Sequence, residues 1–132
     1  MVLLDLPFQR IKGRFFPVPL PPPGTLSGQT VLVTGGTAGL GLAAAMHFAK
    51  LGADVVITCR AKPRGDEAKR KIQNAVPGCA VRVMELDMVH YSSCVGFVEE
   101  LREVRQGEGG IDVAVLNAGI LMPHFVRSPE GW

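Results

Sequence analysis

A glycine-rich turn, residues 34–41 (TGGTAGLG), is the stretch of the sequence best suited to hold a ligand. It separates an apolar run from a segment with helical spacing, so Gly35, Gly39 and Gly41 fall where a strand passes into a helix. The first N–H groups of a helix have no partner within it, and with the helix dipole they attract anions. Glycine also lacks the Cβ that would keep a pyrophosphate from the backbone. The turn is predicted to bind a nucleotide, the alternative being a tight turn without a ligand.

Other chemistries find little support. A P-loop ends in Lys followed by Ser or Thr, and Leu42 and Ala43 occupy those places. The three histidines lack metal-ligand spacing: His47, His90 and His124. Cys59 could be a reactive thiol beside Arg60, although a small buried strand residue is the simpler interpretation. No metal site is expected.

The elements that must position the turn alternate along the chain. Apolar runs predict strands at residues 30–34, 53–59, 81–86 and 111–117. Helices are predicted between them at residues 39–51, at residues 66–76, and after a cap at Ser92 or Ser93. Strands joined through helices pair in parallel, with helices on both faces of the sheet. The predicted fold is α/β, a partial Rossmann fold (a doubly wound parallel sheet) of the order β-α-β-α-β-α-β.

Apolar positions within the helices predict the sides that pack on the sheet. For the first helix these are Leu42, Ala45, Met46 and Ala49; for the second, Ala68, Ile72 and Ala75; for the third, Val95, Val98, Leu101 and Val104.

Length and composition limit the class of protein. The chain has 132 residues, which allow one domain, and 47% of them are hydrophobic. A net charge of +2 is too small for the dense basic surface that nucleic-acid binding requires, so no nucleic-acid partner is expected. Three cysteines without C-x-x-C spacing indicate a reduced, cytoplasmic protein. No secretory signal or transmembrane segment is predicted, since no apolar run approaches about 18 residues.

The sequence divides into an arm and a domain. Residues 1–27 are predicted to form a Pro-rich N-terminal arm, since the segment 17–28 (PVPLPPPGTLSG) carries five of the ten prolines. An extended segment along the domain is the favoured interpretation, and a polyproline ligand or a weak membrane contact are the alternatives. Residues 28–132 would form the nucleotide-binding half-domain.

Three motifs in this order resemble those of the short-chain dehydrogenases/reductases. The T-G-x-x-x-G-x-G signature of that family matches Thr34, Gly35, Gly39 and Gly41, and its N-A-G signature matches Asn117, Ala118 and Gly119. Between them, LDM at residues 86–88 looks like the Asp at the end of the family's third strand. The resemblance covers about residues 26–132 and has the character of retinol-dehydrogenase-like and fungal reductase members.

The resemblance implies a role for each matching residue. The pyrophosphate would be lined by Gly35, Thr37, Gly39, Leu40 and Gly41. Asp87, with the backbone of Met88, would meet the adenine, the alternative for Asp87 being a carboxylate that only precedes a helix. Asn117 would steady the fourth strand, unless it merely ends that strand, and Gly119 would let the backbone pass close to the ribose.

The end of the second strand indicates the cofactor. NAD-preferring sites present a carboxylate there to the ribose 2′-hydroxyl, whereas Arg accommodates a 2′-phosphate. This chain has Cys59 in the carboxylate position and Arg60 beside it, which predicts NADP(H). The alternative is that Arg60, Lys62 and Arg64 are only a solvated positive edge.

The family's catalytic residues are not found in the sequence. Family members use a Tyr with a Lys four residues later and a Ser, but the single tyrosine, Tyr91, is followed at that distance by Val95. The resemblance therefore implies the N-terminal cofactor-binding part of an NADP-dependent oxidoreductase for a carbonyl or alcohol, lacking its Ser-Tyr-Lys residues and inactive alone. The alternative is a non-catalytic nucleotide-binding or interaction module, with a protein partner covering the fourth strand.

Overall fold

The computed structural model describes residues 19, 21–108, 110–120, 123–124 and 127–131. Four parallel strands form one sheet: β1 (Thr30–Val33), β2 (Asp54–Cys59), β3 (Val81–Glu85) and β4 (Val113–Val115). Three helices connect them: α2 (Gly39–Lys50), α3 (Lys62–Ala75) and α4 (Tyr91–Glu108). The predicted β-α-β-α-β-α-β order of a partial Rossmann fold is confirmed.

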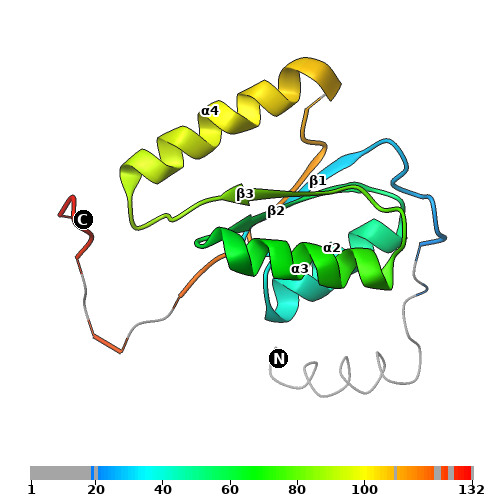
Figure 1. Cartoon of the computed structure of the whole chain (residues 1–132), viewed down its shortest axis with the longest axis horizontal. Coiled ribbons are helices and arrows are strands. Elements are labelled where there is room, and N and C mark those ends of the chain that lie inside the picture. The colour runs from blue at the N-terminus through cyan, green and yellow to red at the C-terminus, as the bar shows by residue number, and fades with distance from the viewer. Residues whose placement is uncertain (1–18, 20, 109, 121–122, 125–126, 132) are drawn as a thin grey trace, which may run out of the picture.

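The strand order in the sheet is β3-β2-β1-β4. Helices α2 and α3 cover one face, and α4 lies over the other (Figure 1). The chain moves outward from β1 to β3 and then returns to place β4 on the opposite side of β1. Ligands of open α/β sheets bind at the carboxyl ends of the strands where the order reverses in this way, which here lies between β1 and β4.

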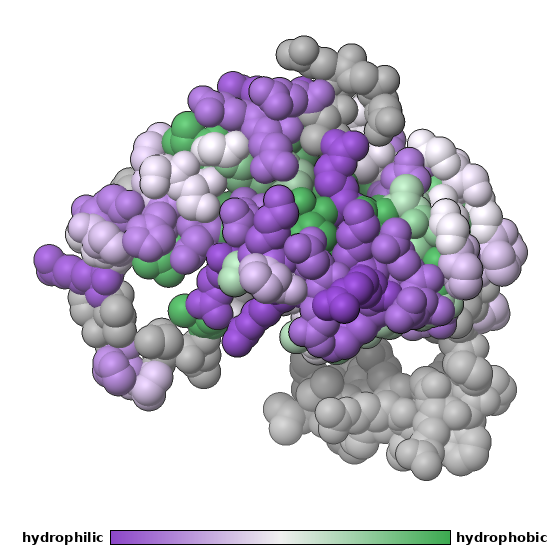
Figure 2. Space-filling view, in the orientation of Figure 1, coloured by the Kyte–Doolittle hydropathy of each residue, from purple (hydrophilic) through white to green (hydrophobic). Residues whose placement is uncertain are grey.

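The larger core lies between the sheet and the helices α2 and α3. Ala45 and Ala49 are small enough to let α2 approach the buried side chains of β1 and β2. Ile72 of α3 packs against the same cluster as Ile57 of β2, and both are fully buried. The outward side of α3 is hydrophilic (Figure 2), as expected for a helix with one face in water.

Two expectations for α3 were wrong. The helix begins at Lys62 and not at residue 66, because Pro63 fits the first turn, where its missing N–H costs nothing. Ala75 is exposed instead of facing the sheet, and the buried positions of the helix are Gly65, Ala68 and Ile72.

The sheet-facing side of α4 also differs from the prediction. Phe97 is buried there, and Cys94 and Leu101 pack beside it. The predicted inward residues Val95 and Val98 are 38% and 43% exposed, whereas Leu101 is placed as expected. Positions 94, 97 and 101 form a stripe adjacent to the valine stripe, and the larger Phe97 side chain has more apolar area to bury. The side chain of Val104 lies outside the described part of the chain.

Among the described strands, β4 pairs only with β1 and forms an edge of the sheet. Ala114 pairs with Leu32 and faces the same side of the sheet as α4, where it is exposed. Leu116, just beyond the strand, is 82% exposed. Apolar surface at this edge is therefore open to solvent.

Most of the predicted arm, residues 1–18 and 20, lies outside the described residues. The arm joins the domain at Leu26, which packs against the α2 and α3 core and donates its backbone N–H to the Leu51 carbonyl at 2.9 Å. Within the described ranges, no helix combines the length and apolar character needed to cross a bilayer.

Candidate functional site

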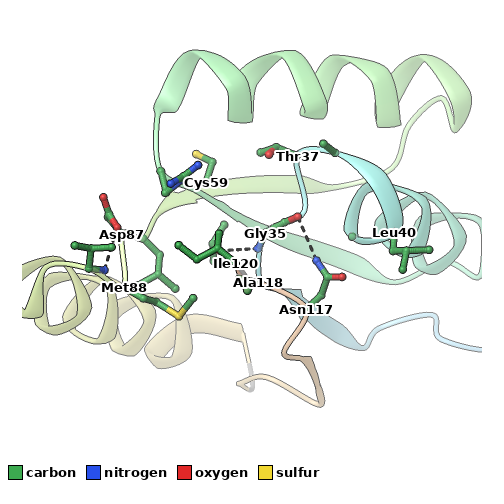
Figure 3. A pocket seen from close by; sticks show the side chains of 16 residues that line it. Gly35, Thr37, Leu40, Cys59, Asp87, Met88, Asn117, Ala118 and Ile120 are labelled. Carbon is green, nitrogen blue, oxygen red and sulfur yellow. Dashed lines mark hydrogen bonds between the residues drawn. The ribbon is translucent and has the colours of Figure 1, made fainter. Parts of the chain in front are cut away.

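A cavity of about 640 Å³ opens at the carboxyl ends of the strands. Its walls come from the segments that follow all four strands (Figure 3). Nine of the ten predicted site residues line it: Gly35, Thr37, Leu40, Gly41, Arg60, Asp87, Met88, Asn117 and Gly119. Gly39 is not among the lining residues. Residues as far apart in sequence as Gly35 and Gly119 thus line one cavity, whose volume is in the range of small-ligand sites.

The start of α2 presents a positive helix end to this cavity. The N-cap residue, Ala38, makes no side-chain cap, and the first turn contains no acidic residue. The opening N–H groups of the helix therefore lack the side-chain acceptors that commonly cap a helix. Gly39 has a φ of +54°, and a Cβ there would face open space. An anion such as a pyrophosphate fits this arrangement.

Gly41 is required by contacts within the protein. A Cβ at position 41 would collide with the Gly35 carbonyl oxygen and lie 2.5 Å from Asn117 Nδ2. The sequence argument assigned this glycine to close approach of a pyrophosphate. The structure adds a second reason, because the helix start packs directly on the turn and on the segment after β4.

Thr58 holds the glycine turn from β2, and the sequence analysis missed it. Its Oγ1 accepts the backbone N–H of Gly35 at 3.1 Å, and the side chain is buried. The Gly35 N–H is therefore already engaged by the protein. The available signal was that Thr58 is a polar residue inside the otherwise apolar run VVITC.

Thr34 and Asn117 join the ends of β1 and β4. Thr34 Oγ1 accepts the backbone N–H groups of Asn117 and Ala118, each at 3.0 Å. Asn117 Nδ2 in turn donates to the carbonyls of Thr34 at 3.0 Å and Gly35 at 3.4 Å. The predicted role of Asn117, steadying the fourth strand beside the cavity, is consistent with these bonds and remains a prediction.

The loop after β3 is held by its own hydrogen bonds. Asp87 donates its backbone N–H to Ser93 Oγ at 2.9 Å, and its Oδ1 accepts the Val89 N–H at 3.0 Å. No bond from a described residue engages Asp87 Oδ2, which can accept an N–H from a base. The Met88 side chain is exposed beside it at the cavity. The expectation that Ser92 or Ser93 precedes and caps α4 was wrong, because the helix begins at Tyr91; Ser93 lies in its first turn and helps to fix the loop that carries Asp87.

Position 59 presents a neutral group at the cavity. The Cys59 side chain is 5% exposed, and burial, followed by the nearby Glu85 carboxylate, raises the pKa of its thiol. The uncharged thiol is therefore favoured at neutral pH, which argues against a reactive thiolate. Arg60, which follows, is exposed and lines the cavity.

Apolar side chains complete the lining and were not predicted. Ile120 is the clearest case: it is exposed at the cavity two residues beyond Ala118 (Figure 3). Its position directly after the N-A-G motif was the available signal. In the part of the chain that the structure describes, no group of three His, Cys, Asp or Glu residues could hold a metal ion.

A family model described as short chain dehydrogenase matches residues 29–130. The chain belongs to the short-chain dehydrogenase family. It is 42% identical over 118 residues to the short-chain dehydrogenase/reductase ffsI of Aspergillus flavipes, an alignment covering 86% of this chain and 34% of that protein. It is 34% identical over 123 residues to human retinol dehydrogenase 14, covering 83% of this chain and 36% of that protein. The chain thus spans about a third of the length of these relatives.

Solved structures of family members share the fold. A metagenomic short-chain oxidoreductase in complex with NADP matches with a TM-score of 0.63 and 34% identity, over 73% of this chain and 41% of that one. L-sorbose reductase from Gluconobacter frateurii, complexed with NADPH and L-sorbose, matches with a TM-score of 0.65 and 33% identity, over 78% and 38%.

Proposed function

We propose that this chain is the N-terminal, NADP-binding part of a short-chain oxidoreductase that acts on a carbonyl or alcohol. The observation that carries the proposal is the pairing of a buried, neutral Cys59 with an exposed Arg60 at one wall of the cavity. A carboxylate at position 59 would repel a 2′-phosphate, whereas the Arg60 guanidinium can donate two N–H bonds to it. The NADP and NADPH complexes among the structural neighbours support a phosphorylated dinucleotide.

Each wall of the cavity would hold one part of the cofactor. The helix start at Gly39 to Gly41 would bind the pyrophosphate, and Asp87 would accept a hydrogen bond from the adenine amino group through Oδ2. Gly119 would allow the backbone to pass the ribose. When bound, the cofactor supplies or takes up a hydride at its nicotinamide ring.

Proton transfer is assigned to residues outside this sequence. Tyr91 begins α4 and Val95 lies four residues later, so no Tyr-x-x-x-Lys pair is present. We infer that a continued chain supplies the Ser, Tyr and Lys and that these 132 residues alone do not catalyse hydride transfer. The intact mass of the native polypeptide in its source cells tests this: a mass well above 14.1 kDa is expected, and 14.1 kDa itself would contradict the inference.

Arg60→Asp tests the cofactor assignment in the native-length protein. Dissociation constants for NADPH and NADH are measured by titration. Loss of a charge-assisted pair and its replacement by a repulsive carboxylate should lower the preference for NADPH at least about tenfold. Arg70→Asp is the matched control, because it makes the same charge change at an exposed position on α3, outside the cavity lining. An unchanged NADPH-to-NADH ratio in Arg60→Asp would show that Arg60 is only a surface charge.

The open edge at β4 favours a second candidate function, a non-catalytic nucleotide-binding module completed by a protein partner. Leu116 and Ala114 expose apolar surface there, and an unpaired strand edge can accept another strand. A photoreactive residue at position 116 tests this in cells. Cross-linking to another protein would favour the module, and cross-linking only within a longer polypeptide would favour the oxidoreductase. Either function would be carried out in the cytosol.

A further inference from the structure

Helix α3 begins without a cap of its own. Its N-cap residue, Ala61, has no side-chain acceptor, and its first turn contains no acidic residue. Lys62 and Arg64 instead place positive charge at the positive end of the helix, which is unfavourable. The local sequence alone therefore does not explain how this helix start is stabilised.

The N–H groups of the first turn can be accounted for one by one. Pro63 has none. The N–H groups of Arg64 and Gly65 both donate to the Ala61 carbonyl, at 3.0 and 3.3 Å. Only the Lys62 N–H remains, and it donates to Glu85 Oε1 at 3.1 Å. A carboxylate from β3 thus caps a helix that starts 23 residues earlier in the chain.

The end of β3 and the residue that follows it fix both ends of the segment that carries Arg60. Glu85 is the register partner of Cys59, the last residue of β2. The next residue along, Leu86, donates its N–H to the Cys59 carbonyl at 2.8 Å. Glu85, which ends β3, and Leu86, which follows it, therefore hold the chain immediately after Ala61 and immediately before Arg60. Arg60 lies between these two fixed points at the cavity wall.

We propose that Glu85 is a positioning residue that sets the preference for a 2′-phosphorylated cofactor by fixing the loop from which Arg60 reaches that phosphate. The inference rests on the proposed function, in which the cavity binds NADP. Glu85 lies outside the cavity lining and acts through the Lys62 N–H. The negative charge of Glu85 acts in the opposite direction, because a nearby carboxylate repels a phosphate. The length of the Glu85 side chain and its charge therefore have different effects on NADPH binding, and substitutions that change only one of them can separate the two.

Two variants of the native-length protein separate these effects. Glu85→Gln keeps an acceptor oxygen at the same distance and removes the charge. Glu85→Asp keeps the charge and withdraws the oxygen from the Lys62 N–H by one methylene. Glu67→Gln on α3 is the control for simple loss of an exposed carboxylate, since Glu67 pairs with Lys71 and not with the loop. NADPH and NADH dissociation constants are measured for all three variants and the wild type.

Positioning predicts that Glu85→Asp weakens NADPH binding roughly fivefold, as for a lost helix cap, with less than a twofold change for NADH. Glu85→Gln and Glu67→Gln should retain the wild-type ratio or slightly favour NADPH. Equal ratios in Glu85→Asp and wild type would overturn the inference, as would a Glu85→Gln variant that loses as much NADPH binding as Glu85→Asp.

A measurement without cofactor separates failure of this inference from failure of the proposed function. Amide hydrogen exchange at Lys62 should be faster in Glu85→Asp and unchanged in Glu85→Gln, whether or not NADPH binds. Unaltered exchange in Glu85→Asp would overturn the positioning role even if NADPH is the cofactor. Absence of NADPH binding by the wild type would overturn the proposed function and, with it, the assigned effect on cofactor preference.

Discussion

Substitution of Thr34 by Val should uncouple the ends of β1 and β4. Thr34 is 7% exposed, and its Oγ1 accepts two backbone N–H groups, from Asn117 and Ala118, each at 3.0 Å. Val has nearly the same shape but no acceptor. The Asn117 N–H also reaches the Val115 carbonyl at 3.0 Å, so the Ala118 N–H suffers the greater loss. Because the Ala118 N–H loses its acceptor and the Asn117 N–H loses one of two acceptors, the free energy of unfolding should fall by about 2 kcal/mol.

Urea denaturation of the wild type, Thr34→Val and Thr34→Ser measures this effect. Ser retains the hydroxyl and loses only a methyl group, so Thr34→Ser should keep most of the stability that Thr34→Val loses. The same Thr34→Val variant should bind NADPH more weakly, because Asn117 and Gly35 then lose their fixed relation at the cavity wall. Stability of Thr34→Val within about 0.5 kcal/mol of the wild type, the usual range for neutral substitutions, would refute the reasoning.

Three further predictions concern other contacts. Gly41→Ala should lower the free energy of unfolding by about 2 kcal/mol and NADPH affinity at least about tenfold, because its Cβ would overlap the Gly35 carbonyl and crowd Asn117. Retained NADPH affinity in titration would contradict this. Glu130 accepts the Tyr91 N–H at 3.1 Å, and this bond lowers the pKa of its carboxyl below the ordinary 4.5. The contribution of the Glu130 carboxylate to stability is therefore present above pH 4.5 and is lost as pH falls through the lowered pKa. In denaturation at a series of pH values, the free energy of unfolding should fall less steeply in acid for Glu130→Gln than for the wild type. Parallel curves would contradict this. Alkylation of Cys59 at neutral pH should be much slower in the folded protein than in denaturant, since burial raises its pKa, and equal rates by mass spectrometry would refute a buried thiol.

The alternation of strands and helices was predictable because each element carries its own period. The apolar runs of β1 and β2 and the spacing of Ala45 and Ala49 are local signals. The boundary of α3 and the inner side of α4 were not fixed by such signals. Pro63 is compatible with both a loop and a first turn, and α4 carries two adjacent apolar stripes of which only tertiary packing selects one.

The residues around the cavity were largely predictable from motifs, but their hydrogen bonds were not. Gly35, Asp87 and Asn117 follow three different strands, and parallel pairing brings those strand ends together. Thr58 holds Gly35, Ser93 holds Asp87, and Thr34 holds Asn117. The polar type of Thr58 inside an apolar run is a signal of a buried bond, but residue types do not show which backbone group each hydroxyl binds. The Glu85 cap on α3 depends on the register between β2 and β3, which a single sequence does not give.

A structure of the native-length protein determined with NADPH tests the central claim most directly. We expect the pyrophosphate at the start of α2, the adenine beside Asp87 and the 2′-phosphate within hydrogen-bond distance of the Arg60 guanidinium. NADPH bound elsewhere, or bound in this cavity with its 2′-phosphate away from Arg60, would contradict the proposed cofactor site.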